Sequence, residues 1–194
     1  MMLENLSKYR IILASNSPRR KELLEGLGLS FQVRVLKGID ESYPENLSGE
    51  EIALYISRKK AEAYRRTQAE DELIITADTI VYVDGEVLGK PQDKEDAARM
   101  FRLMSGRTHQ VITGVCVQTK EKTVQFASTT DVTFAQLTEE EIGHYIDCFH
   151  PFDKAGAYGI QEWIGYIGIT GINGSYYNVV GLPVQRLYTV LKQF

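Results

Sequence analysis

The run Leu73–Val83 consists almost entirely of apolar and β-branched residues, and it is the feature that most restricts the fold. Such a run is typical of a strand that is buried on both faces. The pair Asp84-Gly85 follows directly and favours a tight turn into a second, short strand over residues 86–88. The segment therefore predicts a buried strand that continues into a hairpin.

Helical and strand patterns alternate along the rest of the chain. The expected strands are residues 11–14, 31–35, 109–119 and 123–135, and two short ones before the final helix. The expected helices begin at Ser17-Pro18, at a Ser48/Glu51 capping box, at Asp93, at a Thr138/Glu141 capping box and at Pro183. This order predicts an α/β fold with a mixed sheet.

The length of 194 residues and the apolar content of 43% predict one domain over residues 1–194, because such a chain buries a sizeable core. No apolar run approaches the roughly 18 residues of a membrane span. Cys116 and Cys148 are expected to be free buried thiols. We therefore expect a cytoplasmic protein without a membrane partner. The net charge of −4 argues against a stable nucleic-acid complex.

The helix expected after Ser17-Pro18 begins with Arg19, Arg20 and Lys21. The first turn of a helix carries partial positive charge and unpaired N–H groups, so acidic side chains are favoured there. Basic side chains at this point suit a bound phosphate, which arginine matches with its paired donors. The alternative is a solvated basic turn, and these residues alone do not decide between the two.

A carboxylate inside the buried strand is a second chemical signal. Asp78 is costly to bury unless it is paired, hydrogen-bonded or bound to a metal. It is either a structural residue at a strand break or a functional group. Asp40-Glu41 offers a further carboxylate, and the periodicity of the long helix places Lys59 and Lys60 at or beside its apolar face.

Together these groups fit a polyphosphate and a divalent cation, for which magnesium is the natural choice. The three histidines and two cysteines are too scattered for a zinc site. A Gly-x-Ser-x-Gly elbow is also absent, so the sequence gives no support to a serine hydrolase.

Several motifs, in this order and spacing, resemble the Maf family over about residues 10–192. They are Ser15-Asn16-Ser17-Pro18-Arg19-Arg20, Lys60-Ala61, Ala77-Asp78-Thr79, Gly89-Lys90-Pro91, Ser105-Gly106 with His109, Asp153 to Gln161, and Gly174 to Pro183.

The resemblance implies a curved mixed α/β sheet with flanking helices and two lobes around a cleft, similar to inosine triphosphatases. It also implies a nucleoside triphosphate pyrophosphatase that releases a nucleoside monophosphate and pyrophosphate, with magnesium or manganese as cofactor. By the same resemblance, Asp78 accepts the proton of the attacking water, and Glu41 and Asp78 hold the metal. The residues implied to bind phosphate are Ser15, Arg19, Arg20, Lys60 and Lys90.

A narrower resemblance concerns the base. Arg20, Thr79 and Gln161 match the specificity positions of the dTTP/UTP branch, and a glutamine amide offers the donor and acceptor that a uracil or thymine edge requires. Modified pyrimidine nucleotides are also expected to fit. Two departures are Glu162-Trp163, where the family usually has Gly after the glutamine, and His150-Pro151-Phe152.

The resemblance leaves one alternative function. The family name reflects inhibition of septum formation, so a regulator of cell division that only binds nucleotide or nucleic acid competes with the enzyme. The acidic composition disfavours nucleic acid as the principal ligand. Homodimers occur in the family, so the resemblance also leads us to expect a homodimer.

Overall fold

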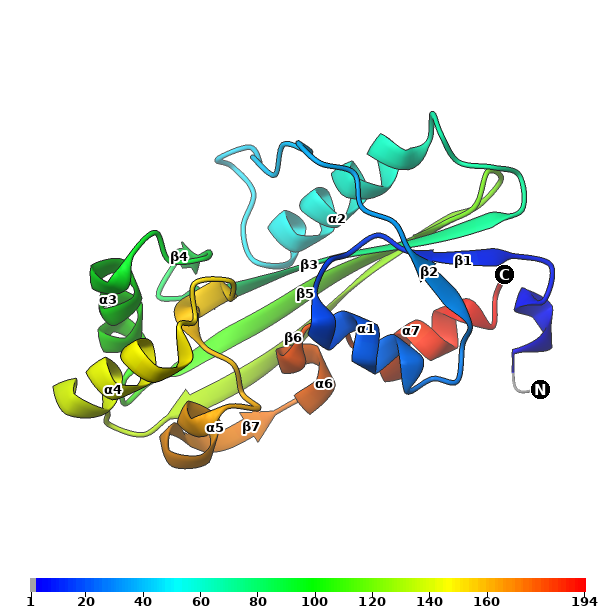
Figure 1. The fold of residues 1–194 in the computed structure, drawn as a ribbon. Helices are drawn as coiled ribbons and strands as arrows, with labels where there is room; N and C mark the ends of the chain where they lie inside the picture. Colours follow the sequence, from blue (N-terminus) through cyan, green and yellow to red (C-terminus); the bar gives the residue numbers. More distant parts are fainter. Residues whose placement is uncertain (1–2) are drawn as a thin grey trace. The chain divides into compact units, whose positions relative to one another are not determined.

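A computed structural model describes residues 3–194 as a mixed α/β structure (Figure 1). The strands are β1 (Arg10–Leu13), β2 (Phe31–Val33), β3 (Glu72–Val83), β4 (Glu86–Leu88), β5 (Thr108–Gln118), β6 (Thr123–Phe134) and β7 (Ile169–Asn173). They form a seven-stranded sheet in the order β2-β1-β3-β5-β6-β7, with β4 paired to β3. Strand β1 pairs in parallel with β2 and β3, whereas the pairs β3–β4 and β6–β7 are antiparallel. The mixed sheet with flanking helices confirms the expected fold class.

The helices begin at most of the expected caps. Ser17, Asp93 and Thr138 each accept a hydrogen bond from a backbone N–H of the first turn, and Thr138 and Glu141 form the complete capping box. The helices are α1 (Pro18–Glu25), α2 (Glu50–Tyr64), α3 (Lys94–Met104), α4 (Glu139–Phe149), α5 (Trp163–Gly168), α6 (Tyr176–Val180) and α7 (Val184–Leu191), with short 3₁₀ turns η1 (Glu4–Leu6) and η2 (Ala155–Ala157). No helix within residues 3–194 is long and apolar enough to cross a membrane.

The chain divides into two compact units. The first contains the described residues up to Asp78 together with Thr113–Ser128 and Gly181–Phe194, and the second contains Thr79–Ile112 and Thr129–Val180. Strands β3, β5 and β6 contribute residues to both units. The expectation of a single domain stays a prediction.

In the first unit, strand alternation directs side chains to two separate clusters. Ile11 and Leu13 of β1 pack with Leu24 of α1 and Leu187 of α7, whereas Ile12 packs with Ile74 and with Tyr64 of α2. Successive side chains of a strand point to opposite faces, so α1 and α7 cover one face and α2 covers the other, as Figure 1 shows. A strand covered on both faces is mostly apolar, which explains the composition of β1 and β3, and the polar Thr76 and Asp78 of β3 therefore need partners.

In the second unit, α3 and α4 pack beside each other and close one large apolar cluster. Ion pairs tie the start of each helix to the end of the other, Lys94 to Asp147 at 2.6 Å and Arg102 to Glu139 at 2.7 Å. Phe101 of α3 lies edge-on to Tyr145 of α4, with ring centroids 5.5 Å apart. Tyr145 is therefore held in the core of this unit.

Three expectations were wrong. The long helix begins after Gly49, whose φ of 47° favours glycine, so Gly49 and not Ser48 is the N-cap, although the Glu51 side chain accepts a hydrogen bond from the Ser48 N–H at 3.2 Å, as expected of a capping box. The region after α4 holds one strand, β7, and two short helices instead of two strands, because packing overrides the β propensity of its aromatic and branched residues. Cys116 and Cys148 are both free, but Cys148 is exposed instead of buried.

Candidate functional site

The turn between β1 and α1 has the geometry that its sequence predicted. The Ser17 hydroxyl accepts a hydrogen bond from the backbone N–H of Arg20 at 3.4 Å, and the Ser15 hydroxyl accepts one from the N–H of Ser17 at 3.2 Å. The first turn of α1 contains no acidic residue. Arg19 and Arg20 therefore stand at the positive end of a helix, where a bound anion is favoured.

Arg20 is hydrogen-bonded to the backbone of two other segments, the end of β3 in the first unit and the residues before α7. Its Nε donates to the carbonyl oxygen of Gly181 and its Nη1 to that of Ala77, each at 2.9 Å, and Nη1 lies 3.5 Å from the Ser15 hydroxyl. Burial lowers the pKa of the guanidinium, against the attraction of nearby Asp78. Because arginine titrates far above neutrality, Arg20 stays charged. It holds the backbone immediately before Asp78.

Asp78 lies opposite Lys60 of α2. Along β3, Asp78 and Thr76 share the face that α2 covers, and the Thr76 hydroxyl donates to the Ser57 carbonyl oxygen at 2.6 Å. One helical turn later, Lys60 Nζ donates to Asp78 Oδ1 at 2.7 Å and lies 3.0 Å from Glu41 Oε1. The side chains of Lys60 and Asp78 are only 15% and 12% exposed. The strand carboxylate is therefore paired, as its burial requires.

Lys59, the residue before Lys60 in α2, holds the segment that carries Glu41. Lys59 Nζ donates to Asp40 Oδ2 at 2.7 Å and to the Ser42 carbonyl oxygen at 3.1 Å. The hydrogen bond from Lys59 lowers the pKa of Asp40 below its usual range. Consecutive lysines thus hold consecutive acidic residues, Lys59 with Asp40 and Lys60 with Glu41.

The predicted metal ligands lie together around Lys60. Among residues 3–194, no group of three or more His, Cys, Asp or Glu side chains is arranged to hold a metal ion. Glu41 and Asp78 supply two carboxylates. That number suits Mg²⁺, which proteins commonly hold through one or two carboxylates, with substrate phosphates and water completing the shell. The donor set fits a cation that binds together with a phosphorylated substrate.

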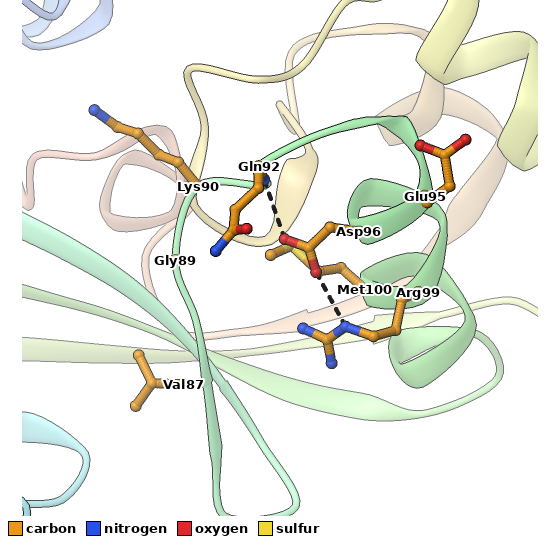
Figure 2. A pocket seen from close by; sticks show the side chains of 8 residues that line it. All are labelled: Val87, Gly89, Lys90, Gln92, Glu95, Asp96, Arg99 and Met100. Atoms are coloured by element: carbon orange, nitrogen blue, oxygen red, sulfur yellow. Dashed lines mark hydrogen bonds and ion pairs between the residues drawn. The ribbon is translucent and has the colours of Figure 1, made fainter.

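The remaining predicted residues, Thr79, Lys90 and Gln161, belong to the second unit. Thr79 follows Asp78 in β3 and is half-buried, whereas Lys90 and Gln161 are exposed. Lys90 lies on the rim of a surface pocket of about 530 Å³, beside the start of α3 (Figure 2). Figure 2 shows the Lys90 side chain extending away from the Asp96–Arg99 ion pair on the other side of this pocket.

The segment that carries Gln161 contacts the turn of Lys90 and the strand of Thr79, the other two predicted site residues of this unit. The Gly156 N–H donates to the carbonyl oxygen of Gly89, next to Lys90, at 3.0 Å. A Cβ at Gly156 would lie 2.7 Å from Val81 Cγ2, two residues beyond Thr79 in β3. Farther along the segment, the Tyr158 hydroxyl is 2.8 Å from buried His109 Nε2. The structure therefore joins the segment of Gln161 to the turn of Lys90 and to the strand of Thr79.

Comparison with known proteins places these features in a family. The sequence profile of the family described as Maf-like protein matches residues 10–194. The chain belongs to the Maf family. Among its relatives, a dTTP/UTP pyrophosphatase of Phocaeicola vulgatus is 63% identical over 192 residues, which cover 99% of this chain and 100% of that protein. A dTTP/UTP pyrophosphatase of Parabacteroides distasonis is 60% identical over 193 residues, with 100% of both chains covered.

Among solved structures, this Maf chain is similar to a HAM1 protein from Coxiella burnetii. The TM-score is 0.51 at 14% sequence identity, and the match covers 96% of this chain and 100% of that one. At this identity the likeness concerns the fold alone.

The sequence did not point to several groups that contact the predicted site residues. The carbonyl oxygens of Ala77 and Gly181, which Arg20 binds, carry no side-chain signal. The buried contacts of Lys154 and Glu162 were also missed, although Glu162 stood out as a departure from the family pattern. Lys59 had a usable signal, since a lysine at a helix position facing inward needs an acidic partner.

Proposed function

We propose that this Maf protein hydrolyses dTTP and UTP to the nucleoside monophosphate and pyrophosphate, using a divalent cation. The observation that carries the proposal is the position of Lys60 between Asp78 and Glu41, with Arg20 of the α1 turn close enough to both carboxylates for their charges to interact. The names of the two relatives, both dTTP/UTP pyrophosphatases at 63% and 60% identity over nearly the full chain, support the same reaction. These names favour the enzyme over a regulator that only binds nucleotide.

In the proposed reaction, Asp78 activates water. Its carboxylate takes a proton from the water as the water oxygen forms a bond to the α-phosphorus, and the bond from that phosphorus to the bridging oxygen breaks. Pyrophosphate leaves with the bonding electrons. Lys60 holds the Asp78 carboxylate in place at 2.7 Å, and we propose that its ammonium also offsets the negative charge that develops on the phosphate groups.

Phosphate binding is assigned to Ser15, Arg19, Arg20, Lys60 and Lys90. Arg20 already uses two donors to hold backbone carbonyls, so its proposed part is as much to fix the turn as to bind phosphate. Glu41 and Asp78 would hold magnesium or manganese, which neutralises phosphate charge when bound. Thr79 and Gln161 are proposed to contact the base.

The remaining expectations stay predictions. They are a cytoplasmic location, a homodimer, the lack of a stable nucleic-acid complex and the use of modified pyrimidine nucleotides. None of them enters the reaction proposed above.

The proposal is tested with the purified chain and a panel of triphosphates, namely dTTP, UTP, CTP, ATP, GTP and 7-methyl-GTP, each with Mg²⁺ or Mn²⁺. Phosphorus NMR distinguishes pyrophosphate from orthophosphate among the products. We expect pyrophosphate and a monophosphate, formed fastest from dTTP and UTP. Release of orthophosphate, or no turnover of any triphosphate, would refute the proposal. Base-modified uridine triphosphates in the same assay show whether modified nucleotides are preferred.

A further inference from the structure

Glu162, which directly follows Gln161, is enclosed by contacts within the second unit. Its Oε1 lies 3.1 Å from Lys154 Nζ, and the Lys154 side chain is only 9% exposed. Asp153, whose side chain is 59% exposed, also contacts this ammonium at 2.8 Å. A buried lysine requires carboxylate partners, so Glu162 and Asp153 stabilise the charge of Lys154 together.

Tyr145 links the other oxygen of Glu162 to the backbone of the same segment. The Tyr145 hydroxyl donates to Glu162 Oε2 and accepts a hydrogen bond from the Gly159 N–H at 3.0 Å. The Glu162 carboxyl group lies directly against Gly159, because an added Cβ there would be 2.9 Å from Glu162 Cδ and would displace the carboxyl group. Since Tyr145 is anchored in the core by α4 and Phe101, this hydroxyl is a fixed point.

These contacts hold the backbone on both sides of Gln161. Before Gln161, the Gly159 N–H donates a hydrogen bond to the Tyr145 hydroxyl. The backbone of Ile160 packs directly against Gly165, where an added Cβ would lie 1.9 Å from the Ile160 carbonyl oxygen. After Gln161, Glu162 is held by its side chain, and its N–H donates to the Gly159 carbonyl oxygen at 3.0 Å. Gln161 itself stays exposed. The segment therefore presents one exposed amide from an otherwise immobilised stretch of backbone.

A fixed backbone matters because a glutamine amide carries both a donor and an acceptor. Uracil offers an N–H and a carbonyl on the edge where cytosine offers a ring nitrogen and an amino group. An amide that shifts, or that rotates so that its oxygen and nitrogen exchange places, can satisfy either pattern. Selection of one pattern requires the groups that carry the amide to be held in place, since specificity is a difference between two affinities.

We propose that Glu162 is a positioning residue for base recognition. Through Lys154 and Tyr145 it fixes the backbone around Gln161, so that the exposed amide favours a uracil or thymine edge over a cytosine edge. The inference rests on the proposed function, because it assigns Gln161 to the base of that substrate. It adds a three-residue support, Lys154, Glu162 and Tyr145, formed where this chain departs from the family pattern.

The test compares Glu162→Gln, Lys154→Met and the double variant with the unmodified protein. The main readout is the ratio of kcat/KM for UTP to that for CTP. Hydrogen exchange of the Gly159 amide reports the support directly and needs no activity. The control is Glu139→Gln, which removes an exposed carboxylate from a different ion pair of the same unit.

We expect each single variant to lower the UTP-to-CTP ratio roughly two- to tenfold, the range that loss of one immobilised side chain typically costs in binding. The double variant should add little further loss, because both substitutions break the same contact. Gly159 exchange should accelerate in Glu162→Gln but stay unchanged in Glu139→Gln. An unaltered ratio despite faster exchange would overturn the positioning role, and unaltered exchange would overturn the support itself.

The outcome is separable from that of the proposed function. If the unmodified protein turned over no triphosphate, the proposed reaction would be refuted. Base recognition would still be testable, because the affinities for UMP and CMP can be measured from the fluorescence of Trp163 without any turnover. Trp163 is the sole tryptophan and follows Glu162 directly. A UMP preference that falls in Glu162→Gln would still support positioning, and equal affinity for both nucleotides in the unmodified protein would refute it.

Discussion

The Lys60 ammonium lies 2.7 Å from Asp78 and 3.0 Å from Glu41, so one cation serves two carboxylates. The pair with Asp78 is largely buried, whereas Glu41 is 57% exposed. The Asp78 carboxylate inside the sheet is paired with Lys60, and a second carboxylate, that of Glu41, remains accessible to a ligand. This arrangement is what a site needs if it is to bind a cation and a polyanion together.

The Lys59 contact should affect binding more than chemistry. Lys59→Met leaves Asp40 and Ser42 without their shared donor, so the adjacent Glu41 is held less firmly. We expect the KM for metal and substrate to rise about two- to tenfold with little change in kcat, because the loss lies in ordering a binding group. Steady-state kinetics at varied metal concentration measures this. Arg58→Met, which breaks an exposed pair with Glu62 on the same helix, is the control, and equal KM values in both variants would contradict the prediction.

His109 should make the second unit sensitive to acid. Burial lowers the pKa of His109 to about 4, and Nδ1 has no partner among the described residues. The unfolded chain takes up this proton near pH 6.5, so the stabilisation is complete above that pH and is lost as the pH falls towards 4. Between pH 7 and pH 5 we expect His109 to cost about 2 kcal/mol of unfolding free energy. Urea unfolding should show this loss in the unmodified protein and a smaller one in His109→Gln. Equal losses would contradict it.

Gly114 sets how closely α2 approaches the sheet. A Cβ at this position of β5 would lie 2.2 Å from the Ala53 carbonyl oxygen of α2, so the backbone must shift. We expect Gly114→Ala to lower the free energy of unfolding by about 1–3 kcal/mol, as overpacking does. It should also reduce turnover, because α2 carries Lys60. Thermal unfolding and kinetics check both effects. Gly143→Ala, where nothing lies within 4 Å of the added Cβ, should instead be neutral or stabilising, and similar results for both would contradict the account.

Gln161 should govern the choice of base. Gln161→Ala removes the exposed amide without altering the carboxylates around Lys60, so we expect the relative rates with UTP, CTP and dTTP to change while the dependence on metal concentration stays the same. Gln185→Ala on α7 serves as the control. An unchanged substrate profile in Gln161→Ala would show that the base binds elsewhere.

The sequence predicted most elements because their signals are local. Ser17, Asp93 and Thr138 cap helices through their own side chains, and Asp84-Gly85 forms the expected turn, with φ of 49° and 87°. The region after α4 was harder, because packing in the second unit decides its structure. Trp163–Gly168 is rich in aromatic and branched residues and is nevertheless helical.

For the candidate site, the residue types were predictable but their partners were not. A carboxylate in a buried strand requires a cation, and period-2 alternation in β3 places Asp78 on the face that α2 covers. That Lys60 pairs with Asp78 while Lys59 pairs with Asp40 depends on how α2 packs on the sheet, which Gly114 controls from a distant segment. Likewise, the partners of Glu162 come from α4 and from Lys154. Contacts between distant segments carry no local signal.

The most direct test of the account is pyrophosphate release from UTP by Asp78→Asn, measured beside binding of a non-hydrolysable UTP analogue. The amide keeps the size of the carboxylate and can still accept the hydrogen bond from Lys60, but it is a poor proton acceptor. We predict near-normal analogue binding and turnover reduced by about 10²-fold or more, the usual contribution of a general base. Asp147→Asn, another lysine-paired aspartate, should behave like the unmodified protein. Near-normal turnover in Asp78→Asn would contradict the assignment of the reaction to this carboxylate.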